Sequence, residues 1–158
     1  MTATSVTLPD VVAVRAARDR IRPYLPATPM LRHPGIEAAL GTEAWVKHEN
    51  LQPVGAFKVR GGVNLVAGLD ADAKTRGVIA ASTGNHGLSL AYACSLFTVP
   101  CTIFMPRNPN PSKRDAIAAL GARIVEHGEN FDRGVTCYAT GMGRRRAACP
   151  RRDRGPPA

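Results

Sequence analysis

Two short segments hold the residues that could do chemistry, and the first centres on a lysine. The segment NLQPVGAFKVRGG (residues 50–62) places Lys58 near the start of a predicted helix. A helix N-terminus and burial both lower the pKa of a lysine, which frees its amine for nucleophilic or Schiff-base chemistry. Most lysines are ordinary surface residues, so Lys58 alone does not establish a reactive site.

The second segment, STGNHG (residues 82–87), combines small residues, hydroxyls and backbone amides at the start of another predicted helix. Such a place suits an anion, either a carboxylate or a phosphate. Gly84 and Gly87 do not complete the dinucleotide-binding fingerprint, and a single histidine such as His86 is more often structural than a base. A carbonyl cofactor together with an anionic substrate would use both segments.

The elements around residues 82–87 determine where this segment lies. Apolar runs predict strands over residues 77–82, 100–106 and 123–128, with helices between them over 88–97 and 110–122. Strands that alternate with helices through short connections form a parallel sheet with flanking helices. We therefore expect an α/β fold with an open parallel sheet. Ligands bind beyond the carboxyl ends of the strands in such sheets, and residues 82–87 follow such an end.

The segments that precede this unit carry weaker signals. Residues 23–31 contain three prolines, which predicts extended chain or turns. Residues 43–49 indicate a short strand, and residues 56–69 indicate a helix that the Gly61–Gly62 pair weakens. Capping boxes predict helix starts at Thr7, with Asp10, and at Ser112, with Asp115. The second of these helices is expected to stop at Gly121.

The net charge of +9 raises the question of nucleic-acid binding. More than half of the excess lies in residues 141–158, which hold six arginines and one aspartate, and the rest has few aromatic side chains to stack on bases. We therefore expect no specific nucleic-acid partner. No apolar run reaches the roughly 18 residues of a membrane span, and the N-terminus lacks the features of a signal peptide. These patterns predict a cytoplasmic protein without a membrane partner.

The cysteines point to no special chemistry. None of the four forms a C-x-x-C pair, and no Cys/His cluster has the spacing of zinc ligands; the positions are Cys94, Cys101, Cys137 and Cys149. Free thiols in a reducing compartment are the ordinary interpretation of such a set. We therefore expect neither a disulfide nor a metal site.

The two chemical segments together resemble a known family. ENLQPVGAFKVRGG (residues 49–62), with STGNHG about 25 residues beyond Lys58, is similar to the pyridoxal-phosphate enzymes of the tryptophan-synthase-beta-like fold. The resemblance is closest to the threonine/serine dehydratase branch, which also holds serine racemases and hydroxyectoine-pathway dehydratases. The downstream stretch NPSKRDAIAALGARIVEHG agrees, and the match covers roughly residues 5–138.

The resemblance implies pyridoxal 5'-phosphate as cofactor and gives roles to three residues around it. Lys58 would hold the cofactor as a Schiff base and later shuttle the α proton. Phe57 would pack against the cofactor, and Asn85 would hydrogen-bond its ring 3-hydroxyl. The reaction would be α,β-elimination of water from a hydroxy amino acid, which gives a 2-keto acid and ammonia. The cofactor is the electron sink in such chemistry, and the protein supplies position and electrostatics.

The resemblance also makes STGNHG the substrate loop. Ser82, Thr83, Gly84 and His86 would clasp the substrate carboxylate, in part through backbone amides. Thr83 stands where racemases of the family have a hydroxyl residue on the opposite cofactor face, so an amino-acid racemase remains an alternative. Cysteine-synthase relatives differ more, because they usually have Asp after the lysine and Thr at the position of His86. Ala56 replaces a serine that is common before the Phe–Lys pair, a small-for-small change.

The resemblance also implies that much of the family's chain has no counterpart here. Nothing in the sequence is similar to the family's glycine-rich phosphate loop. We expect residues 1–52 to be an amino-terminal piece of the large domain and residues 53–140 to be the small α/β domain. The chain would then be a truncated enzyme with impaired activity, or an inactive remnant. The family's members are usually homo-oligomers, and the absent parts should leave apolar surface exposed.

Residues 141–158 form an Arg/Pro-rich irregular tail that breaks the pattern. It is either a solvated charged tail, with adventitious affinity for polyanions, or an out-of-frame reading of a GC-rich gene. We favour the second interpretation, because residues 129–140 resemble a helix that the following sequence does not complete. Sequencing of the gene distinguishes the two.

Overall fold

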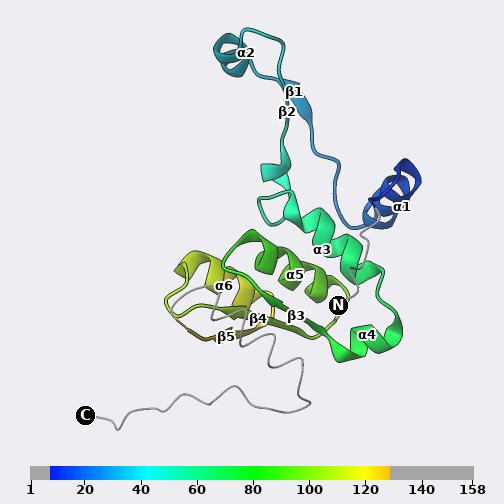
Figure 1. Cartoon of the computed structure of the whole chain (residues 1–158), viewed down its shortest axis with the longest axis vertical. Helices are drawn as coiled ribbons and strands as arrows, with labels where there is room; N and C mark the ends of the chain where they lie inside the picture. The colour runs from blue at the N-terminus through cyan, green and yellow to red at the C-terminus, as the bar shows by residue number, and fades with distance from the viewer. Residues whose placement is uncertain (1–7, 129–158) are drawn as a thin grey trace, which may run out of the picture.

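The computed structural model describes residues 8–128, and its centre is a three-stranded parallel sheet (Figure 1). The strands are β3 (Val78–Ala81), β4 (Cys101–Met105) and β5 (Arg123–Glu126), in the order β3-β4-β5. Ala80 pairs with Ile103, and Ile103 pairs with Ile124. The expected α/β fold with a parallel sheet is confirmed, and the three predicted strands each form within their predicted ranges.

Helices α5 (Asn85–Leu96) and α6 (Pro111–Ala119) pack on this sheet and on each other. The side chains of β4 alternate, so that Cys101, Ile103 and Met105 are buried and the two between them are half-buried. Ile103 and Ile117 are fully buried, and α5 is apolar enough to be buried over most of its length. Burial of this kind is the main driving force for the fold, so the core lies between these helices and the sheet.

Two further helices complete the packed body. Helix α3 (Lys58–Ala67) packs along α5, and helix α1 (Val11–Ile21) packs on α3. The Gly61–Gly62 pair lies inside α3 and does not end it. A Cβ on Gly62 would lie 2.6 Å from the carbonyl oxygen of Ser89, so glycine is what allows α3 and α5 to approach so closely. Helix α4 (Ala71–Arg76) then leads into β3.

An arm, residues 30–47, projects from this body (Figure 1). It consists of β1 (Met30–Arg32), α2 (Pro34–Leu40) and β2 (Trp45–Lys47), followed by a short 3-10 helix η1 (Glu49–Leu51). The expected strand in residues 43–49 is confirmed as β2. It pairs with β1 in a separate antiparallel sheet, which the sequence pattern did not predict. The strands and the helix of the arm contain no buried residue. Exposed apolar side chains, which we expected from the sequence, are present in the arm at Met30, Leu31, Leu40 and Trp45.

Both capping predictions require correction. The Asp10 carboxylate itself caps α1 and accepts from the backbone N–H of Ala13 at 2.8 Å, and Thr7 lies outside the described residues. Asn110, not Ser112, caps α6, because its side chain accepts from the N–H of Lys113 at 3.2 Å. Pro111 favours the first helical position, which moves the cap one residue before it. Gly121 has a positive φ of 81° just after α6, as a helix stop requires.

The expectations for the cysteines and for residues 129–158 can be compared with the structure only within the described residues. Cys94 and Cys101 are free and buried, whereas Cys137 and Cys149 lie outside the described residues. The interpretation of residues 129–158 as an unfinished helix and an irregular tail also falls outside them. Within residues 8–128, no helix is long and apolar enough to cross a membrane.

Candidate functional site

The two chemical segments meet where helices α3 and α5 begin. Lys58 is the first residue of α3, and Asn85 is the first residue of α5. The two helices start at the same end of the body (Figure 1) and touch at Gly62 and Ser89, each four residues into its helix. The starts of the helices, with Lys58 and Asn85, are therefore neighbours. The prediction that Lys58 lies at a helix start is confirmed.

Lys58 lies at the surface of the body, not in its core. Lys58 is exposed, and its Nζ lies 5.8 Å from the ring centroid of Phe57, which is itself 63% exposed. The helical repeat explains this, because Val59, Val63 and Val66 are the residues of α3 that are fully buried. Lys58 and Phe57 thus lie on the open side of the junction, where an incoming molecule can reach the amine.

The loop between β3 and α5 is shaped by the hydroxyl of Ser82. Ser82 is buried, and its Oγ accepts from the backbone N–H of Gly87 at 2.8 Å and of Gly84 at 3.3 Å. A Cβ on Gly87 would lie 3.1 Å from the Ser82 Cβ and 3.2 Å from a methyl of Ile103, so this turn is tightly packed. The Ser82 oxygen therefore holds the turn together by accepting from both amides.

The other loop residues face outward. Thr83 and His86 are exposed, and a Cβ on Gly84 would meet nothing within 4 Å. Among residues 8–128, no atom accepts a hydrogen bond from the backbone N–H of Asn85 or His86. The first N–H groups of a helix lack partners within it and carry its positive dipole end. These two amides can therefore bind an anionic group.

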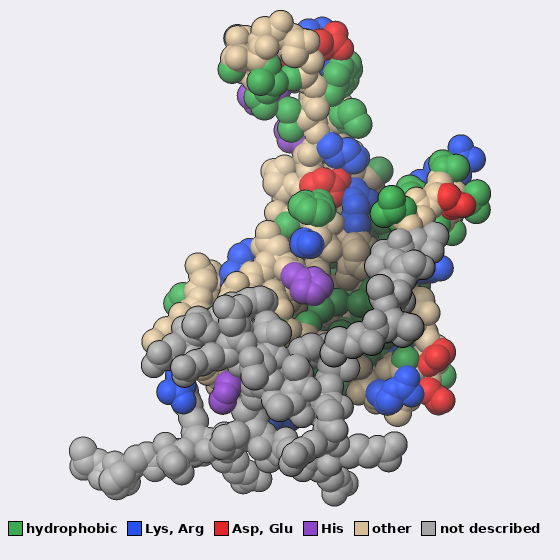
Figure 2. All heavy atoms as spheres, in the orientation of Figure 1, with side chains coloured by type: hydrophobic (Ala, Val, Ile, Leu, Met, Phe, Trp, Pro, Cys, Tyr) green, Lys and Arg blue, Asp and Glu red, His purple; other side chains and the backbone are tan. Residues whose placement is uncertain are grey.

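Lys113 joins this edge from helix α6. Its Nζ donates to Asn85 Oδ1 at 2.7 Å. Sequence reasoning did not single out Lys113, although it lies in the NPSK stretch at the start of a helix that follows a predicted strand. The carboxyl ends of β3 and β4 lie at one edge of the parallel sheet, which brings the starts of α5 and α6 together. Figure 2 shows histidine and basic side chains on the surface above α3 and α5.

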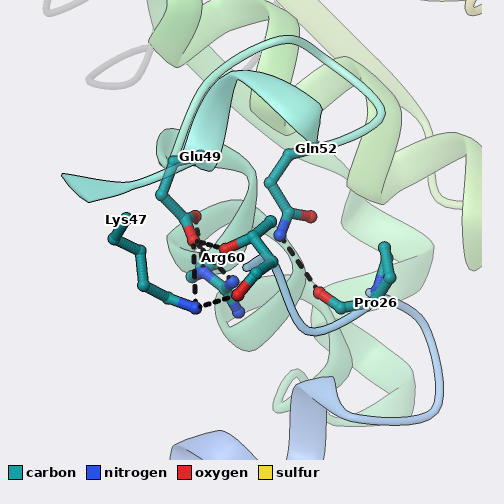
Figure 3. Close-up of polar contacts among 6 residues, drawn as sticks. Pro26, Lys47, Glu49, Gln52 and Arg60 are labelled. Carbon is teal, nitrogen blue, oxygen red and sulfur yellow. Dashed lines mark hydrogen bonds and ion pairs between the residues drawn. The ribbon is translucent and has the colours of Figure 1, made fainter. Parts of the chain in front are cut away.

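A cluster around Glu49 fixes the chain just before Lys58 (Figure 3). Glu49 accepts two hydrogen bonds of 2.7 Å from the Arg60 guanidinium and one of 2.5 Å from Thr28 Oγ1. Lys47 Nζ lies 4.0 Å from the same carboxylate and donates to the Thr28 carbonyl at 2.6 Å. The hydrogen bonds from Arg60 lower the pKa of Glu49 from 4.5 to about 2.

The Glu49 cluster connects the end of the arm, at Lys47, to α3, because Arg60 lies in the first turn of that helix. Gln52 adds a contact at the base of the arm, between the chain that follows the arm and the chain that precedes it: Gln52 is buried, and its Nε2 donates to the Pro26 carbonyl at 3.1 Å. Sequence reasoning missed both. Glu49 and Arg60 stand in the segment that carries the resemblance, but only the fold shows that they pair across eleven positions.

The residues present fit a carbonyl cofactor with an anionic partner. An accessible amine, two backbone amides at a helix start and the carboxamide of Asn85 lie at one junction. The amine can form a covalent bond with an aldehyde, and the amides can hold a carboxylate or a phosphate. This donor set is the one that the chemistry inferred from the sequence requires.

Comparisons with known proteins agree with this chemistry. The model of the family "Pyridoxal-phosphate dependent enzyme" matches residues 21–148. The chain is 39% identical to L-threonine ammonia-lyase of Geobacter sulfurreducens over 75% of its length and 30% of that protein. It is 38% identical to beta-hydroxyaspartate dehydratase of Paracoccus denitrificans, over 75% of the chain and 38% of that protein.

The structure is similar to that of maize serine racemase, with a TM-score of 0.78 and 32% identity over 83% of this chain and 40% of that one. The chain thus spans about a third of the length of the curated relatives that it matches. These relatives differ in reaction, since one is named a lyase, one a dehydratase and one a racemase.

Proposed function

The chain belongs to the family of pyridoxal-phosphate-dependent enzymes, and from this premise we propose that it carries the reactive lysine and the carboxylate loop of an ammonia-lyase. The proposed reaction eliminates water from a hydroxy amino acid of the threonine or serine type, and hydrolysis of the resulting imine, which takes up one water again, yields a 2-keto acid and ammonia. The observation that carries the proposal is the position of Lys58 and Asn85 as the first residues of two contacting helices that begin at the same end of the body.

In this proposal, pyridoxal 5'-phosphate supplies the electron sink that stabilises negative charge on the substrate's α carbon. Lys58 Nζ holds the cofactor covalently and then takes the α proton from the substrate. The exposure of Lys58 supports this role, because the amine is open to an incoming aldehyde. Phe57 lies beside Lys58, with its exposed ring available to pack on a planar ligand.

The loop residues bind and orient the substrate in this proposal. The free N–H groups of Asn85 and His86 support a contact with the substrate carboxylate. Ser82 keeps those amides in place through its bonds to the Gly84 and Gly87 amides. The carboxamide of Asn85 supplies a donor for the ring oxygen of the cofactor.

A racemase is the second candidate, and Thr83 is the observation that favours it. Its side chain is exposed in the loop, where a hydroxyl could return a proton to the opposite face of the substrate. The similarity to maize serine racemase supports the same candidate. A lyase releases a 2-keto acid, whereas a racemase converts the L-amino acid to the D-enantiomer, so the products distinguish the two.

The experiment is a titration of the purified chain with pyridoxal phosphate, followed by absorbance and compared with Lys58→Ala. We expect a weak Lys58-dependent band and little turnover, because the chain spans about a third of its relatives' length. Production of 2-keto acid from threonine or serine would establish the lyase in this chain, and D-enantiomer would establish the racemase. A band of equal strength in Lys58→Ala would refute the proposed role of Lys58.

A further inference from the structure

The contact between Lys113 and Asn85 joins two helices of the site that are 28 residues apart in sequence. Lys113 is half-buried, and its Nζ donates to Asn85 Oδ1 at 2.7 Å. The bond ties the start of α6 to the start of α5. Its chemistry determines how the Asn85 carboxamide is oriented.

An asparagine side chain has an acceptor oxygen and a donor nitrogen that can exchange places by a 180° turn. A lysine ammonium only donates, so the atom of Asn85 that faces Lys113 must be Oδ1. The two N–H donors on Asn85 Nδ2 then point to the other side. Lys113 thereby selects one of the two orientations of the Asn85 carboxamide. In that orientation, Asn85 offers a donor rather than an acceptor on the side that faces away from Lys113.

The position of Lys113 is unusual for its own helix. It lies in the first turn of α6, where the helix dipole disfavours a cation, and that turn holds no acidic residue. The neighbouring acids Asp115 and Glu126 both pair with Arg114. Local helix stability therefore does not account for a lysine here. Residues that break a local rule are often placed for function.

We propose that Lys113 is a positioning residue, which holds the Asn85 carboxamide so that Nδ2 donates to an oxygen of the bound cofactor. This inference rests on the proposed function, because it needs a cofactor oxygen as acceptor. Without the lysine, the amide turns freely between a donating and an accepting orientation. A negatively charged or partly charged oxygen is repelled by the accepting orientation.

The test uses the full chain and four variants: Lys113→Met, Lys113→Arg, Asn85→Ala and the double variant Lys113→Met/Asn85→Ala. Lys74→Met is the matched control, because it removes a lysine that lies over the Phe97 ring and away from this edge. The readouts are the NMR resonances of the Asn85 side-chain amide without cofactor, and the equilibrium constant for the Lys58 adduct with pyridoxal phosphate.

We expect Lys113→Met to shift the Asn85 amide resonances and to weaken the adduct about fivefold, the effect of one hydrogen bond. Lys113→Arg, which also only donates, should retain both properties, and Lys74→Met should change neither. In the Asn85→Ala background, Lys113→Met should have no further effect, because the lysine acts only through the asparagine.

Three results would overturn the inference. In Lys113→Met, the Asn85 resonances could stay unchanged, or the equilibrium constant of the Lys58 adduct could stay unchanged. In the Asn85→Ala background, Lys113→Met could weaken the adduct as much as it does in the wild-type chain. The last result would mean that Lys113 contacts the ligand directly. A wild-type chain that forms no adduct at Lys58 would instead refute the proposed function. The orientation of Asn85 would then be judged by its NMR resonances alone.

Discussion

The body and the arm of this chain differ in how they are held together. The body buries a continuous apolar core between α3, α5, α6 and the parallel sheet. The arm has two short paired strands and one helix, with no buried residue among them. It reaches the body through polar contacts around Glu49 and Gln52. Lys58 lies where the two meet, so the body positions its helix and the Glu49 cluster fixes the chain before it.

The largest effect should come from the core of the body. Replacement of Ile103 by Ala removes a fully buried side chain and should cost about 2–5 kcal/mol in the free energy of unfolding. Leu40→Ala in the arm, where the side chain is 64% exposed, should change it by less than about 0.5 kcal/mol. Urea denaturation measures both. Equal losses would contradict the distinction between body and arm.

The next effect concerns the contact that brings the two chemical segments together. Gly62→Ala places a methyl 2.6 Å from the Ser89 carbonyl oxygen, which should destabilise the fold by about 1–3 kcal/mol. Gly61→Ala is the matched control, because its Cβ would meet nothing within 4 Å. A helical alanine there should stabilise by up to about 1 kcal/mol. Thermal unfolding measures both changes in stability. A loss for Gly62→Ala with a gain for Gly61→Ala would support the role of the α3–α5 contact, and changes of the same sign would contradict it.

The Glu49 cluster should give a smaller effect that depends on pH. The pKa of Glu49 is lowered to about 2 by Arg60, so its contribution is present above pH 4.5 and disappears as the pH falls towards 2. Glu49→Gln should cost about 1–2 kcal/mol at neutral pH and much less near pH 2. The measurement is the free energy of unfolding across this pH range.

Glu37→Gln is the control for Glu49→Gln. Glu37 also pairs with an arginine, Arg32, but both residues lie in the arm, so the contact with the body is retained. The Arg32 hydrogen bond lowers the pKa of Glu37 as well. If Glu37→Gln reproduced the loss seen in Glu49→Gln, the cluster would not be the link between arm and body.

The smallest effect tests the corrected cap of α6. Asn110→Ala removes the side chain that accepts from the Lys113 N–H and should cost about 1 kcal/mol. Ser112→Ala, at the cap position expected from the sequence, should be close to neutral. Thermal unfolding of the two variants compares them directly, and a larger loss in Ser112→Ala would restore the original assignment.

The body could be predicted from the sequence because its signals are local. Apolar runs at residues 77–82, 100–106 and 123–128 became β3, β4 and β5, and parallel pairing follows from the helices between them. The arm could be predicted only in part, since residues 43–49 indicated β2 but its partner β1 lies beyond an intervening helix, and no local pattern shows that the two pair. Its strands are three residues each.

In the candidate site, too, some features could be predicted from the local sequence and others could not. Lys58 and the loop at residues 82–87 were identified from their residue types and from the resemblance of the segments that hold them. The contacts Arg60–Glu49 and Lys113–Asn85 depend on tertiary placement, which no spacing in the sequence encodes. The exposure of Lys58 also follows from packing, because the buried side of α3 is taken by its valines.

The chain contains four lysines, Lys47, Lys58, Lys74 and Lys113, and this makes one measurement decisive. The protein is incubated with pyridoxal phosphate, reduced with borohydride, digested, and the modified peptides are quantified by mass spectrometry. We expect the label to be concentrated on Lys58, at the start of α3. An even distribution over the four lysines, or a preference for one of the other three, would contradict it.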